Sequence, residues 1–160
     1  MKPDPRWVSV TSMSDPTQAG THAVEKLLQG YNCAQAVLHA NCTKLGFPHD
    51  TALQLACGFG AGMGRTEEVC GAVTGGVIAL GLRYGRGEAE DDAKTEETYE
   101  RTRAFMERFA ARHGSVICRE LIECDLLTPE GRSYYRKQDV LHQTCAHCVR
   151  TAATLVDEMI

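Results

Sequence analysis

The sequence predicts an all-α fold, a compact bundle of several helices with a glycine-rich central segment. Apolar residues recur three and four positions apart, which is the period of an amphipathic helix, and no stretch alternates as a strand does. Residues that start and stop helices bracket these periodic stretches. The 160 residues match the length of one domain. We therefore expect a single helical domain over residues 14–160, behind a flexible N-terminal arm over residues 1–13.

Capping residues precede each of the first three predicted helices, and a glycine follows the first two. Ser, Asp and Asn side chains accept hydrogen bonds from the free N–H groups of a first turn, and glycine adopts the left-handed conformation that ends many helices. The helices expected here run from Pro16 to Gly30 (cap Ser14 or Asp15), from Cys33 to Leu45 (cap Asn32, stop Gly46) and from Thr51 to Cys57 (cap Asp50).

Glycine occupies every second position from Gly58 to Gly64. A glycine inside a helix costs up to about 1 kcal/mol relative to alanine, so this stretch is expected to be a loop or a tightly packed irregular turn. Glu67 and Glu68 suit the first turn of the next helix, because carboxylates are stabilised at the positive end of the helix dipole. We expect that helix to run through Tyr84.

The second half of the chain carries the clearest helix signals. A fifth helix is predicted to start in an acidic cluster and to end in basic residues before a glycine, and both charge biases match the helix dipole. Three further helices are expected after it. The predicted fifth helix starts at Glu88, Glu90, Asp91 and Asp92 and ends at Arg108, Arg112 and Gly114. Ser115 is expected to cap a short sixth helix, Thr128, Pro129 and Glu130 mark the start of the next one, and the last helix covers residues 140–159.

Charge and hydropathy exclude several classes of protein. The formal net charge is −4 and no basic stripe is visible, which argues against nucleic acid binding. The N-terminus has no apolar signal region, and the longest uncharged apolar run, Val69–Leu82, is shorter than the about 20 residues of a membrane span. We therefore expect a cytoplasmic protein that binds neither nucleic acid nor membrane.

Cysteine is unusually frequent for such a protein. A reducing compartment disfavours structural disulfides, so many cysteines point to metal or redox chemistry. A free cysteine can also be a small buried hydrophobe, which accounts for some of them. The eight residues are Cys33, Cys42, Cys57, Cys70, Cys118, Cys124, Cys145 and Cys148.

Cys70 opens the segment Cys-Gly-Ala-Val-Thr-Gly. In the first turn of a helix, the dipole would lower the pKa of this thiol and favour the thiolate. Gly71 and Gly75 are four residues apart and share one helix face, where another backbone can approach closely. Two interpretations remain open: tight helix packing alone, or room for a cofactor or substrate beside Cys70.

Cys145 and Cys148 form a second thiol feature. They are three residues apart on one helix face, and His142 lies three residues before them, so the group is either a redox CxxC or half of a metal site. Val149 stands where a c-type haem would need histidine, which excludes that cofactor. Four other histidines are scattered along the chain and are interpreted as surface or core residues: His22, His39, His49 and His113.

Helical spacing separates the other cysteines. Cys118 and Cys124 would point to different faces of a helix, and Cys33 and Cys42 to opposite faces. A cluster of thiols must therefore gather cysteines from different helices, an arrangement that suits a cofactor at the centre of a bundle.

These segments resemble those of the CGCAxxG family of redox-active proteins. The family pattern is an early cysteine, a Cys-Gly-Ala-x-x-Gly segment and two later cysteines. In this chain it matches Cys33, Cys70, Cys118 and Cys145, over roughly residues 20–158. A similar motif occurs in split-Soret cytochrome c, which also carries an iron–sulfur centre. The resemblance implies a redox function in which the four matched cysteines ligate a cluster. The other four cysteines are additions that either enlarge this site or form a second one.

Our first hypothesis is therefore an electron-transfer protein. It would bind an iron–sulfur cluster through the four cysteines that match the family pattern, beside Gly71 and Gly75, and it would exchange electrons with an unidentified redox partner protein. The glycine-lined helix also suggests a homodimer, because its face permits close packing.

Two other hypotheses remain. The chain could be a metal-free thiol–disulfide oxidoreductase, with Cys70 and Cys145 as catalytic thiols and Cys70 attacking as the thiolate. It could instead be a metal-binding module without catalysis that uses Cys145, Cys148 and His142.

Overall fold

Helices make up nearly all the regular structure in residues 17–88 and 92–160, the part of the chain that this computed structural model describes. No β-strand occurs in this part, where Val69 and Ile117 form an isolated antiparallel bridge. The all-α fold class predicted from the sequence is confirmed. The helices are α1 (Gln18–Leu28), α2 (Cys33–Leu45), α3 (His49–Ala56), α4 (Gly60–Met63), α5 (Gly71–Tyr84), α6 (Ala93–His113), α7 (Cys118–Ile122), α8 (Pro129–Lys137) and α9 (Ala146–Met159).

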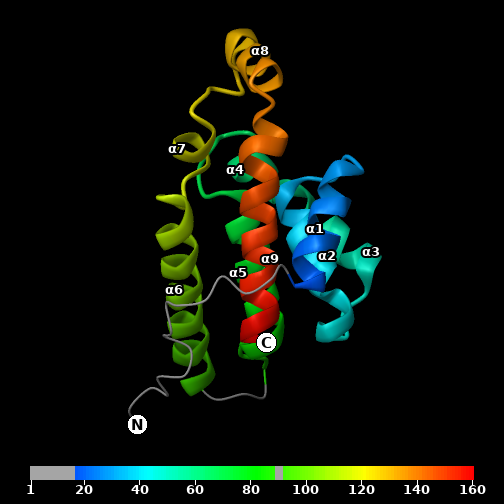
Figure 1. Cartoon of the computed structure of the whole chain (residues 1–160). Helices are drawn as coiled ribbons and strands as arrows, with labels where there is room; N and C mark the ends of the chain where they lie inside the picture. The colour runs from blue at the N-terminus through cyan, green and yellow to red at the C-terminus, as the bar shows by residue number, and fades with distance from the viewer. Residues whose placement is uncertain (1–16, 89–91) are drawn as a thin grey trace.

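Two helices form the centre of the bundle. α5 and α9 lie side by side, α6 packs on one side of them, and α1, α2 and α3 lie on the other (Figure 1). α7 and α8 lie at the end of the bundle where α9 begins (Figure 1). None of the described helices is long and apolar enough to span a membrane. The largest fully buried side chains of the core are Leu38, Val73, Leu80, Phe105, Phe109, Val149 and Leu155.

The predicted boundaries of α2 are confirmed to the residue. The Asn32 side chain accepts from the backbone N–H of Gln35, while the Gln35 side chain accepts from the backbone N–H of Asn32, which makes a complete capping box. Gly46 ends the helix in the left-handed conformation, with φ 63°. The predicted start of α8 is also confirmed, because Thr128 caps it through the backbone N–H of Gly131.

Two early helices begin at residues other than those predicted. α1 begins at Gln18 behind the N-cap Thr17, whose hydroxyl accepts from the backbone N–H of Gly20. The predicted caps Ser14 and Asp15, like the predicted arm over residues 1–13, lie outside the described residues. α3 has Pro48 as its N-cap, so Asp50 lies in the first turn instead of capping it.

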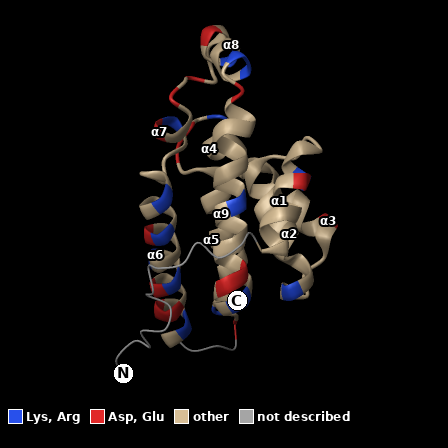
Figure 2. Ribbon diagram, in the orientation of Figure 1, with Lys and Arg blue, Asp and Glu red and all other residues tan. Residues whose placement is uncertain are grey.

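The long helix α6 carries basic and acidic residues along its length (Figure 2). Its predicted end is confirmed: Arg112 and His113 lie in the last turn, and Gly114 follows with φ 85°. Asp92 is the N-cap, while the predicted acidic residues Glu90 and Asp91 lie outside the described residues.

The short helix α7 starts at Cys118 after the N-cap Ile117. Ser115, the predicted cap, lies further upstream and accepts from the backbone N–H of Ile117.

The segment before α5 corrects the predicted start of that helix. Glu67 has a φ of 58°, which a right-handed α-helix does not contain, so α5 begins at Gly71 instead of Glu67. Ala61, Met63 and Arg65 also have positive φ, so the short α4 is interrupted by non-helical backbone. Cys70 is therefore the N-cap of α5, not a member of its first turn.

Tertiary contacts hold this irregular segment in place. Glu67 is buried, and its carboxylate accepts from the backbone N–H of Leu126 at 2.6 Å and pairs with Arg119. The backbone N–H of Cys118 donates to the carbonyl of Glu68 at 2.7 Å. Glu67, which the sequence predicts to stabilise the start of a helix, instead connects the segment before α5 to the segment that carries Cys118.

The last helical stretch covers the predicted residues 140–159 with one irregularity. Leu141–Cys145 form a π-helical turn, and α9 continues directly from Ala146. A π-turn inserts one extra residue into a helix and occurs frequently at functional sites. Here the turn ends at Cys145.

Candidate functional site

Five cysteines that are far apart in the sequence line one cavity of about 140 Å³. The set contains the four cysteines that match the family pattern together with the additional Cys148. The described elements therefore gather cysteines from different helices, as helical spacing required. The five residues are Cys33, Cys70, Cys118, Cys145 and Cys148.

Three of these cysteines lie at helix starts. Cys33 is the first residue of α2, Cys70 is the N-cap of α5, and Cys118 is the first residue of α7. Cys145 closes the π-turn, and Cys148 follows it by three residues in the same continuous helical stretch. At the start of α5, the backbone N–H groups of Ala72 and Val73 hydrogen-bond the Cys70 sulfur, and such groups stabilise a thiolate.

The rest of the cavity wall is mainly apolar. Cys70, Cys118 and Cys145 are 5%, 6% and 9% exposed, so little of each thiol reaches solvent. Charges and thiolates are costly in such surroundings unless they are hydrogen-bonded. The other lining residues are Leu27, Tyr31, Asn32, Ala61, Gly71, Leu121, Ile122, Leu126, Tyr135, Leu141 and Thr144.

Cys33 and Cys145 form a hydrogen-bonded thiol pair. The hydrogen bond from the Cys33 thiol, helped by the Tyr135 hydroxyl 3.4 Å from the Cys145 sulfur, outweighs burial and lowers the pKa of Cys145 to about 7. The same hydrogen bond, together with burial, raises the pKa of Cys33. The first proton that the pair loses as the pH rises therefore leaves Cys145, and it does so near neutral pH.

Cys70 and Cys148 form a second pair. The hydrogen bond from Cys148 lowers the pKa of Cys70, and the backbone N–H groups of Ala72 and Val73 lower it further. The same bond raises the pKa of Cys148, which is 1% exposed. Cys145 and Cys148, predicted as a CxxC unit on one helix face, thus find their hydrogen-bond partners on other helices.

Cys118 is the fifth thiol of the cavity. Burial, together with the neighbouring Cys70 and Cys145, raises its pKa to about 12. This thiol remains protonated at neutral pH unless a cation or cluster takes the place of its proton.

No sequence pattern marks two side chains that contact the thiols. Tyr135 of α8 belongs to no motif, and the sequence predicts His113 only as a surface or core residue. The His113 Nδ1 atom lies 3.8 Å from the sulfur of Cys148, although 35 residues separate the two. Neither pair could be found without the fold that brings the elements together.

The other three cysteines do not line the cavity. Cys42 is fully buried and its thiol donates to the carbonyl oxygen of Leu38 in its own helix. Cys57 is exposed, and Cys124 is partly buried. His142 also lies outside the cavity lining, where its Nδ1 pairs with Asp139 at 2.6 Å.

The two glycines predicted beside Cys70 have different surroundings. Gly71 lines the cavity, and a Cβ atom there would lie 3.1 Å from the Cβ of Cys33. Gly75 lies outside the lining and faces α2, where a Cβ atom would lie 2.6 Å from the carbonyl oxygen of Ala34. At Gly75 the close approach is therefore made by another helix backbone.

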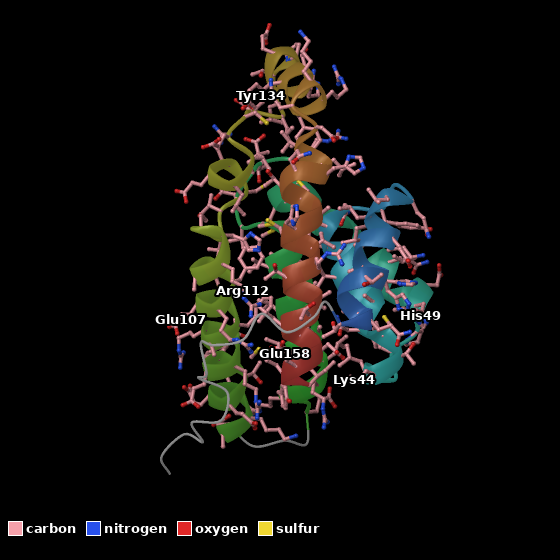
Figure 3. All side chains as sticks on the ribbon, viewed as in Figure 1. Lys44, His49, Glu107, Arg112, Tyr134 and Glu158 are labelled. Carbon is pink, nitrogen blue, oxygen red and sulfur yellow. The ribbon has the colours of Figure 1, made fainter. Side chains whose placement is uncertain are left out.

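Three of the scattered histidines meet at a second cavity of about 230 Å³. His22, His39 and His49 line it, and the rings of His39 and His49 are 4.7 Å apart. Figure 3 shows His49 on α3, on the side of the bundle away from α6. Within residues 17–88 and 92–160, no group of three or more His, Cys, Asp or Glu side chains is arranged around a single point as one metal ion requires.

Comparison with known proteins gives one match. A protein family described as "Putative redox-active protein (C_GCAxxG_C_C)" matches residues 31–159, which include all five cysteines of the cavity. No curated protein and no solved structure matches the chain.

Proposed function

The chain belongs to the C_GCAxxG_C_C family of redox-active proteins, and from this premise we propose that its cysteine cavity binds an iron–sulfur cluster for electron transfer. The observation that carries the proposal is the shared cavity of the four matched cysteines, Cys33, Cys70, Cys118 and Cys145. Cys42, Cys57 and Cys124 lie elsewhere. Apart from Cys148, which lines the same cavity, the division drawn from the family pattern is therefore also a division in space.

The donor set fits such a group. Cysteine thiolates are the usual ligands of iron–sulfur clusters, and a cluster binds them at separate irons, so they need not converge on one point. The apolar wall would exclude water, and the N–H groups at the start of α5 would stabilise the negative charge of the Cys70 thiolate. When bound, the cluster would accept and donate single electrons. The chain's own residues supply the thiolates, their hydrogen bonds and the surrounding apolar wall.

Purification without oxygen tests this proposal. We expect a brown protein whose iron and acid-labile sulfide are lost when Cys33, Cys70, Cys118 or Cys145 is changed to serine. Cys57→Ser, at an exposed thiol outside the cavity, is the matched control and should keep the wild-type iron content. Full iron in the Cys145→Ser variant, or equal loss in the control, would contradict the ligand assignment.

The hydrogen-bonded pairs favour a second candidate, a metal-free thiol–disulfide oxidoreductase. The Cys70 thiolate would attack one sulfur of a substrate disulfide and release the other sulfur as a thiol. Cys148 would then attack the mixed disulfide, forming a Cys70–Cys148 disulfide and releasing the second substrate thiol. An iron-free, colourless wild-type protein that reduces a disulfide dye, and a Cys148→Ser variant that traps the mixed disulfide, would support this candidate.

A further inference from the structure

Cys148 and His113 lie where α6 and α9 pack together. His113 is the last residue of α6, and its imidazole stacks on Phe109 with the ring centroids 4.6 Å apart. Figure 1 shows α6 and α9 running side by side through the bundle. The imidazole is therefore fixed by packing, with Nδ1 toward Cys148 at 3.8 Å.

The Cys148 sulfur already has two partners. On the cavity side it hydrogen-bonds Cys70, and on the other side it meets the Nδ1 atom of His113. A thiol has one proton to donate, and a neutral imidazole carries one N–H. The Nε2 atom of His113 is buried and has no hydrogen-bond partner among the described residues, so Nδ1 carries that N–H. The donors then run in one direction, from His113 Nδ1–H to the Cys148 sulfur and from the Cys148 S–H to the Cys70 sulfur.

We propose that Cys148 is a positioning residue, oriented by His113, that donates a hydrogen bond to the Cys70 sulfur and is neither a cluster ligand nor the functional partner of Cys145. The inference rests on the proposed function, because its consequence is that Cys148 tunes the cluster held by Cys70. Hydrogen bonds to ligand sulfurs stabilise the reduced cluster and raise its reduction potential. This assigns a role to a cysteine and a histidine that the family pattern does not contain.

The first experiment uses the full chain after iron has been removed, and it measures which pairs of thiols lie close enough to form a disulfide. Diamide, an azo oxidant, takes up two electrons and two protons while two S–H bonds break and one S–S bond forms. Peptide mapping is expected to find Cys70 joined to Cys148 and Cys33 joined to Cys145. His113→Leu should slow only the Cys70–Cys148 disulfide, by roughly three- to tenfold, the factor that one lost hydrogen bond gives. The Cys33–Cys145 disulfide is the internal control for folding in that variant.

The second experiment uses the protein as purified with its cluster. Cys148→Ala should keep the iron and lower the reduction potential, while Cys148→Ser, which retains a donor, should lie between Cys148→Ala and wild type. Two results would overturn the inference: a dominant Cys145–Cys148 disulfide in the first experiment, or loss of iron in Cys148→Ala as complete as in Cys70→Ser. A wild-type protein without iron would refute the proposed function alone, because the diamide experiment still decides the position of Cys148.

Discussion

Replacement of Gly75 by alanine tests how α5 and α2 hold the site together. A Cβ atom at this position would lie 2.6 Å from the carbonyl oxygen of Ala34 and 3.0 Å from its Cα atom. Both atoms belong to the backbone of α2, so the contact cannot be relieved by a side-chain rotation. The two helices would have to separate, and their N-terminal ends carry Cys33 and Cys70.

The magnitude follows from two opposing effects. Overpacking in a well-packed core costs about 1–3 kcal/mol of unfolding free energy. Alanine in place of glycine within a helix stabilises by up to about 1 kcal/mol. We therefore expect Gly75→Ala to lower the free energy of unfolding by between about 0 and 2 kcal/mol, and Gly75→Leu to lower it further.

Gly81 of the same helix supplies the matched control. A Cβ atom there meets nothing within 4 Å, so Gly81→Ala should gain the helix propensity without the clash. Both variants gain the same helix propensity, so the difference between their free energies of unfolding contains only the cost of the clash at Gly75. That cost is about 1–3 kcal/mol, or about 2–12 °C in Tm for a protein of this size. Urea unfolding of the iron-free protein measures it. Equal stability of the two alanine variants would refute the close approach of the backbones.

Three further predictions address the chemistry and the supports of the site. In the iron-free protein, the rate at which iodoacetamide alkylates Cys145 should be half-maximal near pH 7 and should fall at lower pH, because the thiolate becomes protonated. Tyr135→Phe should shift this midpoint to higher pH, because the thiolate loses a hydrogen bond, and peptide mass spectrometry would measure both. Asn32→Ala should destabilise the protein by about 0.5–2 kcal/mol in urea unfolding, because α2 loses its capping box. Glu67→Ala should cost about 1–3 kcal/mol, since it leaves the partly buried backbone N–H of Leu126 without its partner. The exposed Glu68→Ala should change stability by less than about 0.5 kcal/mol.

Local signals were sufficient for some elements of the fold. The bounds of α2 follow from Asn32 and Gly46, because a cap and a left-handed glycine act through their immediate neighbours in the chain. The start of α5 could not be found in this way. Glu67 is a good residue for a helix start, yet its positive φ and buried carboxylate are fixed by contacts with Arg119 and Leu126, more than 50 residues away in the sequence. Long-range contacts outweigh local preference at that point.

The candidate site also has a part that the sequence predicts and a part that only the fold reveals. The matched pattern singled out four cysteines that the fold brings to one cavity, but spacing alone suggested that Cys145 and Cys148 act together. The π-turn that ends at Cys145 and the packing of α6 against α9 give each of these thiols a partner on another element. Tyr135 and His113 carry no sequence signal as partners, because a tyrosine or histidine on a helix is most often an ordinary surface or core residue.

At Cys70, a serine substitution can distinguish the contribution of the thiol to stability from its contribution to iron binding. Cys70 is the N-cap of α5, a position where serine is among the preferred residues because its hydroxyl accepts from N–H groups of the first turn. Serine at this position therefore preserves or improves the start of α5 while removing the sulfur. A Cys70→Ser variant that loses iron and keeps its stability would show that the sulfur serves the cluster. A variant that loses both would indicate that the thiol holds α5 in place through its contact with Cys148. Serine at Cys42 cannot distinguish the two roles in this way, because that thiol is fully buried in the protein core and donates a hydrogen bond to the carbonyl of Leu38 in its own helix.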